Sequence, residues 1–247
     1  MERPRIHIGW LYPEYMNLYG DRGNIIVLTQ RSRWHGLDPV VTQVRLGETA
    51  DFRQFDLLMM GGGQDREQAL IAEDFMKVKG NSLAEAIEDG LAVLAVCGGY
   101  QMLGKYFKTH TGEMIRFTGI LDLWTEGGQK RMIGNCIIES DLFGGTRTIV
   151  GFENHSGRTY LGKGLRPLGR VVKGYGNNGS DRTEGVIYKN TVGTYLHGAI
   201  LPKNPHLADW LIQRALDRRY GGEVKIGRLN DDLEMRAHEA IIARFGK

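Results

Sequence analysis

The most constraining feature of this sequence is an apolar run that ends in a cysteine followed by two glycines. The run from Leu91 to Val96 is continuously apolar, which is typical of a strand buried on both faces of a parallel sheet. Cys97-Gly98-Gly99 follows at once and leads into a segment with helical character. This order predicts a nucleophile elbow, in which small neighbours leave room for an exposed nucleophile. The helix start also favours a thiolate and offers N–H groups to a developing oxyanion.

The alternative for Cys97 is a small apolar residue buried in a strand, which is the commoner state of an isolated cysteine. The glycines beside it and its place at the end of the run favour the nucleophile. Cys136 lies inside a strand-like run without such neighbours, so it is predicted to pack. Two cysteines in 247 residues exclude a disulfide framework and suit a reducing compartment.

The pattern of elements predicts an α/β fold with a parallel sheet and helices on both faces, because strands and helices alternate up to about residue 107. From Thr111 to Tyr195, short β-like runs are separated by turns, and we expect them to extend the same sheet as antiparallel strands. The chain then returns to helical periodicity. With no repeat or linker, residues 1–247 are expected to form a single domain. Strands are expected at 6–12, 40–46, 56–60 and 91–96, and helices at 25–34, 67–90 with a break near Gly80, and 98–107.

Charge and hydropathy narrow the possible partners. The net charge is only +3 and no dense stripe of Lys and Arg occurs, so nucleic-acid binding is not expected. The N-terminus lacks the apolar segment of a signal peptide, and no apolar run approaches the length of a membrane span. We therefore expect a cytoplasmic protein without stable membrane insertion. No metal-ligand spacing is present, and no metal is expected.

A second glycine cluster, Gly61-Gly62-Gly63, also follows a predicted strand. Loops at the carboxyl ends of neighbouring parallel strands converge on one crevice, so this loop is expected beside the elbow. A backbone N–H near Gly62 could then complete an oxyanion hole with that of Gly98. A phosphate loop is disfavoured because the G-x-x-x-x-G-K-[ST] pattern is absent, and a plain tight turn remains the alternative.

A cysteine nucleophile requires a histidine base close to it in space. Of the seven histidines, His197 is favoured because it ends an apolar run and is followed by Gly198, which again places it at a strand terminus. His155 is the second candidate. A structural histidine remains the alternative for both.

These three loops, in this order, resemble the class I (triad) glutamine amidotransferases. The run from Cys97 to Gln101 matches the C-x-G-x-Q pattern of that family, with Ala95 where a glycine is common. The family's His-x-Glu pattern is not followed, because Ala199 stands two residues after His197. The run Tyr195-Leu196-His197-Gly198 is instead similar to the cobyric acid synthase branch, which also lacks that glutamate.

Within this branch the chain is similar to the glutaminase subunits of the lipid II isoglutaminyl synthases. The segments 12–24 and 151–157 and the stand-alone length carry this similarity. The resemblance implies a flavodoxin-like open sheet and hydrolysis of L-glutamine to glutamate and ammonia through a thioester on Cys97. It implies His197 as the base, Gly62 and Gly98 as oxyanion donors, Gln101 and Arg131 as substrate contacts, and Asn154 and His155 as weaker substrate-binding candidates. For Arg131 a solvated surface arginine remains the alternative.

The resemblance also implies a heterodimer with a Mur-ligase-like (MurT-like) synthetase subunit. That partner would use ATP, with Mg²⁺, to activate the α-carboxylate of D-glutamate in the lipid II stem peptide during peptidoglycan synthesis, and this subunit would need no cofactor. Because Ala199 replaces the usual glutamate, the acid that orients His197 must come from elsewhere, and we hypothesise that the partner supplies it. The alternatives are a cysteine hydrolase of similar elbow architecture, a non-catalytic subunit with a relict elbow, and a glutaminase for another acceptor such as a corrinoid carboxylate.

Overall fold

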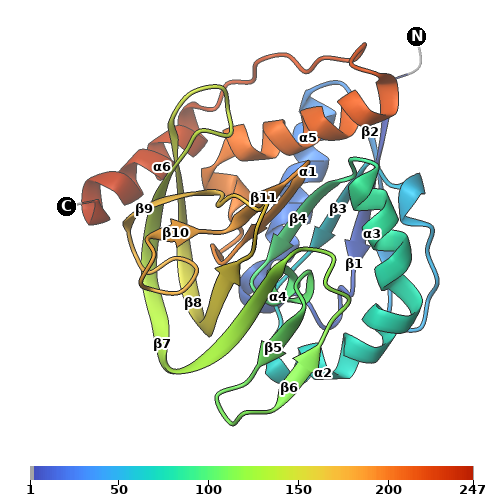
Figure 1. Cartoon of the computed structure of the whole chain (residues 1–247). Coiled ribbons are helices and arrows are strands. Elements are labelled where there is room, and N and C mark those ends of the chain that lie inside the picture. Colours follow the sequence, from blue (N-terminus) through green and yellow to red (C-terminus); the bar gives the residue numbers. More distant parts are fainter. Residues whose placement is uncertain (1–2, 247) are drawn as a thin grey trace.

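The larger of two sheets forms the centre of the molecule. A computed structural model describes residues 3–246, and its first sheet has the order β11-β12-β4-β3-β1-β2 (Figure 1). Five strands run parallel, and β11 is antiparallel to β12. The parallel strands, in the order β2-β1-β3-β4-β12, follow the 2-1-3-4-5 order of flavodoxin-like folds, so the predicted α/β class is confirmed. The strands are β1 (Arg5–Leu11), β2 (Asp38–Val44), β3 (Leu57–Met60), β4 (Ala92–Val96), β11 (Val186–Tyr188) and β12 (Thr191–Thr194).

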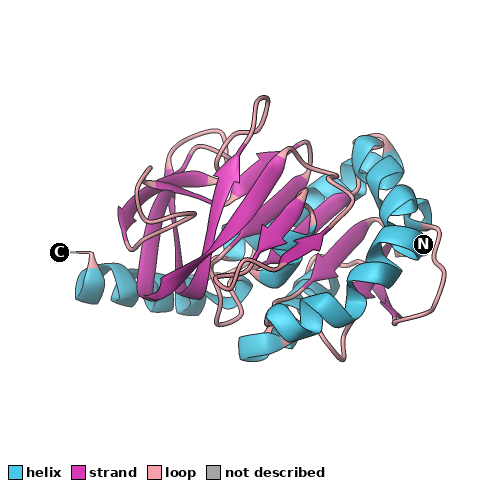
Figure 2. Cartoon of the chain, turned by 60° about the horizontal axis from the view of Figure 1, so that its bottom comes forward, coloured by secondary structure: helices cyan, strands magenta, loops and turns pink. Residues whose placement is uncertain are grey.

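Helices cover both faces of this sheet (Figure 2). On one face, α1 (Arg22–Trp34) and α5 (Pro205–Tyr220) pack against each other and against the strands. On the other lie α2 (Asp65–Asp74), α3 (Gly80–Glu88) and the short α4 (Gly98–Met102), while α6 (Asp232–Phe245) packs against β7 and β8. Single 3₁₀ turns occur at Leu18–Gly20, Phe52–Gln54 and Leu201–Lys203. None of the helices within residues 3–246 is long and apolar enough to cross a membrane.

The segment between residues 106 and 184 corrects one expectation from the sequence. Its strands, β5 to β10, form a second sheet instead of extending the first. The strands that follow this segment, β11 and β12, join the parallel sheet. The reason is the pairing of two long strands: β7 has 18 residues and β8 has 15, and they hydrogen-bond to each other over most of their length. The strands of this second sheet are β5 (Tyr106–Lys108), β6 (Met114–Arg116), β7 (Leu123–Ser140), β8 (Arg147–Leu161), β9 (Gly169–Lys173) and β10 (Thr183–Glu184).

The strand that leads to Cys97 is the most deeply buried part of the core. Every residue of β4 is at most 1% exposed, and it lies between β3 and β12. Burying one Leu or Val side chain stabilises a fold by about 1.5–3 kcal/mol, so β4 is held firmly. The predicted helix after it is shorter than expected: α4 ends at Met102, and Gly104 packs so closely on Leu123 that a side chain there would collide.

The break predicted near Gly80 is a π-helical turn over Phe75–Lys79. Lys79 is fully buried and pairs with Asp74, whose carboxylate also accepts a hydrogen bond of 2.6 Å from the Tyr12 hydroxyl. Tyr12 follows β1 directly and has a positive φ of 51°. This buried cluster therefore anchors the start of the β1–α1 connection, which runs on towards the carboxyl edge of the sheet.

Candidate active site

Cys97 has the backbone of a nucleophile elbow. Its φ of 50° and ψ of −104° lie in a region that non-glycine residues rarely adopt. The turn is held by a hydrogen bond from the Cys97 N–H to the Thr194 carbonyl (2.8 Å) and by one from the Gln101 N–H to the Cys97 carbonyl (3.0 Å). Strain of this kind at a strand-to-helix turn is typical of catalytic nucleophiles.

The two glycines after Cys97 allow the elbow to approach the glycine loop. A Cβ at Gly98 would lie 2.7 Å from the Gly63 carbonyl oxygen, and one at Gly99 would lie 2.8 Å from the Gly61 carbonyl oxygen. The Gly99 N–H also donates to the Gly61 carbonyl at 3.1 Å. The loop after β3 and the elbow after β4 are thus in direct backbone contact, as the sequence predicts.

His197 and Cys97 both lie close to Gly62. A Cβ at Gly62 would lie 2.8 Å from the His197 Cε1 and 3.3 Å from the Cys97 Cβ. The His197 backbone is fixed by a hydrogen bond from its N–H to the Phe152 carbonyl (2.7 Å), and its side chain is 1% exposed. The structure therefore brings together the two residues that the sequence predicts as nucleophile and base.

The electrostatic surroundings of His197 favour its protonated form. Burial lowers the pKa of the imidazole, but the negative charge of Cys97 and the Asp21 carboxylate outweigh it and raise this pKa to about 10. The imidazole consequently favours its protonated form at neutral pH. That proton is available to a leaving amine.

Asp21 is a site residue for which the sequence predicted no chemical role. Its side chain is fully buried; Oδ2 accepts a hydrogen bond of 2.6 Å from the Gly62 N–H, and Oδ1 lies 3.9 Å from the His197 Nδ1. An acid of this chain thus stands at the imidazole nitrogen for which a partner-supplied acid was expected. The available signal was its place in the segment 12–24, which carries part of the family resemblance.

The oxyanion loop differs from the prediction by one residue. The Gly62 N–H, predicted as a donor, is engaged by Asp21. The Gly63 N–H has no hydrogen-bond partner among residues 3–246, and its nitrogen lies 2.8 Å from where a Cβ on Gly98 would be. Gly63 rather than Gly62 is therefore the loop residue with an unengaged N–H close to the Gly98 end of the elbow.

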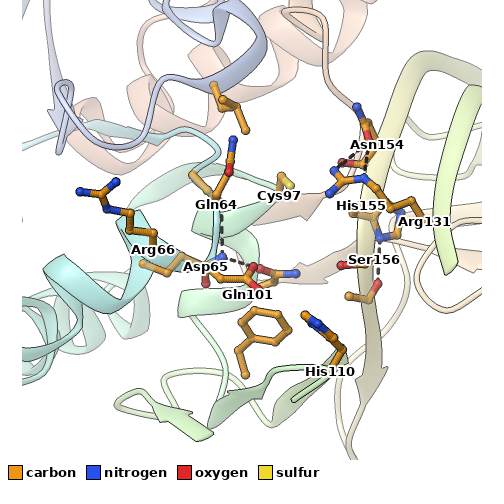
Figure 3. A pocket seen from close by; sticks show the side chains of 15 residues that line it. Gln64, Asp65, Arg66, Cys97, Gln101, His110, Arg131, Asn154, His155 and Ser156 are labelled. Carbon is orange, nitrogen blue, oxygen red and sulfur yellow. Dashed lines mark hydrogen bonds between the residues drawn. The ribbon is translucent and has the colours of Figure 1, made fainter. Parts of the chain in front are cut away.

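A pocket of about 360 Å³ opens over Cys97 (Figure 3). Arg131 lies at its rim on β7, where Asn154 of β8 accepts hydrogen bonds from Nε (3.0 Å) and Nη2 (2.8 Å). His155 is buried in the wall; its ring stacks on Tyr195 at 3.6 Å, and its Nδ1 lies 2.8 Å from the Gly157 carbonyl. All four predicted substrate-binding residues line this pocket, with the others being Leu18, Gly63, Gln64, Asp65, Arg66, Gln68, Phe107, His110, Ser156 and Gly157.

The Gln101 side chain lines the pocket but is already bound within the protein. Its Nε2 donates to the Tyr195 hydroxyl (2.9 Å), and its Oε1 accepts from the Gln68 Nε2 (2.8 Å). Gln68 also contacts the Gly63 carbonyl at 3.3 Å. Gln101 thus braces the glycine loop, and its contact with substrate stays a prediction.

The second cysteine and the possible metal ligands remain to be placed in the structure. Cys136 is fully buried, and burial raises the pKa of its thiol well above the usual value, which agrees with the packing role predicted for it. Among residues 3–246 no group of three or more His, Cys, Asp or Glu side chains is placed to hold a metal ion.

A strained cysteine, a buried histidine and a glycine loop on one flavodoxin-like sheet define the class of cysteine-dependent amidotransferases. Residues 7–205 match the CobB/CobQ-like glutamine amidotransferase domain, and the chain belongs to that family. It is 46% identical over 232 residues to the lipid II isoglutaminyl synthase (glutamine-hydrolyzing) subunit GatD of Staphylococcus aureus, covering 94% of this chain and 93% of that protein. It is 39% identical over 236 residues to the subunit GatD of Streptococcus pneumoniae, covering 95% and 90%.

Solved structures share the fold at much lower sequence identity. The structure of PurLQS from Thermotoga maritima aligns with a TM-score of 0.57 at 18% identity, covering 87% of this chain and 98% of that chain.

Proposed function

We propose that this chain is the glutaminase subunit of a lipid II isoglutaminyl synthase. The observation that carries the proposal is the strained Cys97 facing His197 across Gly62 beneath an open pocket. The acceptor is supported by the similarity to the GatD subunits, which spans at least 90% of both chains in each comparison. The corrinoid alternative is less favoured because a cobyric acid synthase of Methanothermobacter thermautotrophicus is only 32% identical over 203 residues, and the family membership disfavours a general cysteine hydrolase.

The geometry suggests the following course of reaction. The Cys97 thiol passes its proton to His197, the sulfur attacks the carboxamide carbon of L-glutamine, and the Gly63 and Gly98 N–H groups receive the oxyanion. His197, protonated at neutral pH, gives its proton to the departing nitrogen, and ammonia leaves behind a thioester on Cys97. Water then attacks the thioester while His197 takes a proton from the water. This step releases glutamate and restores Cys97 and His197 to their starting state.

Arg131 is the residue that we propose for the α-carboxylate of glutamine. Its guanidinium group is held at two nitrogens by Asn154, which fixes the group at the pocket rim before substrate arrives. A guanidinium fork matches a carboxylate in shape and charge. Asn154 then acts on the substrate through Arg131.

The ammonia released here is proposed to pass to a MurT-like, Mur-ligase-like partner in the cytoplasm. That subunit would use ATP and Mg²⁺ to activate the α-carboxylate of D-glutamate in the lipid II stem peptide, giving D-isoglutamine. The chain described here would contribute no cofactor of its own.

The proposal is tested with the glutamine-analogue alkylator 6-diazo-5-oxo-L-norleucine followed by peptide mass spectrometry. We expect Cys97 to be the modified residue, with protection by L-glutamine, no modification in Cys97→Ala and unchanged modification in the matched variant Cys136→Ser. Failure of Cys97 to react, or hydrolysis of esters and peptides without preference for glutamine, would contradict a glutaminase. Amidation of a corrinoid but not of lipid II by the complex with its partner would contradict the acceptor.

A further inference from the structure

The Asp21 carboxylate lies between the two halves of the site, the glycine loop and the base. Oδ2 accepts the Gly62 N–H at 2.6 Å, and Oδ1 lies 3.9 Å from the His197 Nδ1. We propose that Asp21 is a positioning residue for glutamine hydrolysis, which orients His197 with one oxygen and fixes the glycine loop with the other. This inference rests on the proposed function, because it assigns the orienting role in that same reaction.

The ordinary role of an aspartate at this place in a chain would be different. Asp21 immediately precedes α1, where an aspartate side chain usually accepts a hydrogen bond from an N–H of the first helical turn. Its side chain makes no such capping bond. The carboxylate is turned instead towards the loop after β3, so helix capping does not explain it.

Burial makes this orientation significant. Asp21 is 0% exposed, and a buried carboxylate is stable only beside donors or positive charge. The Gly62 N–H is one such donor, and the protonated His197 supplies the positive charge. A separation of 3.9 Å is longer than a hydrogen bond, but catalytic hydrogen bonds are often long without substrate and shorten in the complex.

The two contacts serve the two requirements of the reaction. With Nδ1 facing Asp21, Nε2 is the nitrogen left to exchange a proton with Cys97. Asp21 holds the Gly62 N–H, and this fixes the position of the next residue of the loop, Gly63, whose nitrogen lies close to Gly98 of the elbow. A Cβ at Gly61 would come within 2.9 Å of the Asp21 Cβ, so the loop and the carboxylate fit closely.

The neighbouring segments hold Asp21 in place. The Leu18 N–H donates to the Gly62 carbonyl at 2.9 Å, and the Asn17 Oδ1 accepts the Arg22 N–H at 2.7 Å. On the far side, the Asn24 Oδ1 accepts the Leu201 N–H at 3.1 Å, which ties α1 to the loop after His197. The start of α1 is thus bound both to the glycine loop and to the segment that carries the base.

The decisive experiment is the Asp21→Asn substitution in the full chain. The asparagine side chain would keep an oxygen for the Gly62 N–H but remove the charge beside His197. We expect kcat for glutamine to fall by about 10²- to 10⁴-fold with KM little changed, the upper value being that of the equivalent change in a serine-protease triad. We also expect the pKa of His197, followed by NMR of isotope-labelled histidine, to fall below that of the parent protein.

Asp56→Asn is the matched control. Asp56 is also a buried aspartate that accepts a backbone N–H, that of His7 at 2.7 Å, but it precedes β3 at the opposite edge of the sheet. This variant is expected to leave kcat and the His197 titration unchanged.

Three outcomes would overturn the inference or locate the failure elsewhere. An Asp21→Asn protein with parental kcat and parental His197 titration would show that Asp21 only packs. If that variant does not fold, the parent protein decides: above the pKa of His197, its neutral imidazole should carry the proton on Nδ1, and a proton on Nε2 would overturn the inference. A parent protein in which Cys97 does not react with the glutamine analogue would refute the proposed function itself.

Discussion

Gly62 is the residue that lies against the nucleophile, the base and Asp21 at once. The sequence predicts it as an oxyanion donor, whereas the structure gives its N–H to Asp21 and leaves no room for a Cβ beside His197 and Cys97. Its lack of a side chain therefore allows His197 and Cys97 to pack this closely on the glycine loop. We therefore propose the donor role for Gly63, whose nitrogen lies close to Gly98.

The Gly62→Ala substitution tests whether the absence of a side chain at this position keeps the base beside the nucleophile. The added methyl group would lie 2.8 Å from the His197 Cε1, so it must displace the base from the nucleophile. Because a misplacement of about 1 Å costs about 10²-fold in rate, we expect a kcat loss of about that size. Gly134→Ala on β7 is the control, since nothing lies within 4 Å of its Cβ position. Equal kcat values in the two variants would show that Gly62 is not a spacer.

Residues with a local signature were predictable, and those defined by distant packing were not. Cys97 and His197 each end an apolar run of the sequence and precede a glycine, so the apolar pattern and the turn-forming glycine together identify them. Asp21 has the local pattern of a helix N-cap, and only the folding of the β1–α1 connection against residues 61–63 gives it another role. Gln68 was missed for the same reason.

At the level of elements, β1 to β4 were predicted within about two residues, whereas β12 was expected to be antiparallel and is parallel to β4, and the second sheet was not predicted. A continuous apolar run is diagnostic of a strand buried on both faces, and β3 and β4 are such strands. Alternation of apolar and polar residues identifies a strand but not the strand with which it pairs, because pairing depends on packing between distant parts of the chain.

Glu184 on β10 makes the stability of this region depend on pH. Burial raises the pKa of its carboxyl from 4.5 to about 8, and it accepts the Tyr195 N–H at 2.6 Å. A raised pKa means that the folded protein binds the proton of this carboxyl more tightly than the unfolded chain does. The stability that the protonated Glu184 contributes is therefore complete below about pH 4.5 and is lost as pH rises through about 8. We expect Tm of the parent protein to decline over this window.

Glu184→Gln is neutral at every pH and is expected to remove that part of the decline. Thermal unfolding between pH 4.5 and 9 provides the measurement. Glu113→Gln, at an exposed position, is expected to reproduce the parental curve. Parallel curves for the parent and Glu184→Gln would mean that Glu184 does not titrate in this range.

On the scale of the whole molecule, the reacting groups come from loops at one edge of the parallel sheet. Asp21, Gly63, Cys97 and His197 follow β1, β3, β4 and β12 respectively, which are four neighbouring strands of the sheet. The convergence of the last three loops was predictable from the rule for open α/β sheets. The walls of the pocket do not follow from that rule, because β7 and β8 reach it from the second sheet, and Arg131, Asn154 and His155 were predicted as substrate contacts only from the family resemblance.

The partner's contribution can be measured by comparing the isolated chain with the complex. We hypothesise that a partner acid helps to orient His197, so glutamine turnover should be faster in the complex. Because Asp21 already stands beside the imidazole, we expect slow but measurable release of ammonia from the isolated chain. Equal rates for the two would rule out the partner acid, and complete inactivity of the isolated chain would show that Asp21 alone is insufficient.

The gathering of every reacting group on one edge of one sheet has an evolutionary consequence. A chain that carries its own nucleophile, base and oxyanion donors can change the enzyme it feeds by altering only its outer surface. Selection can then redirect the nitrogen to a new biosynthetic route while the chemistry that liberates it stays untouched.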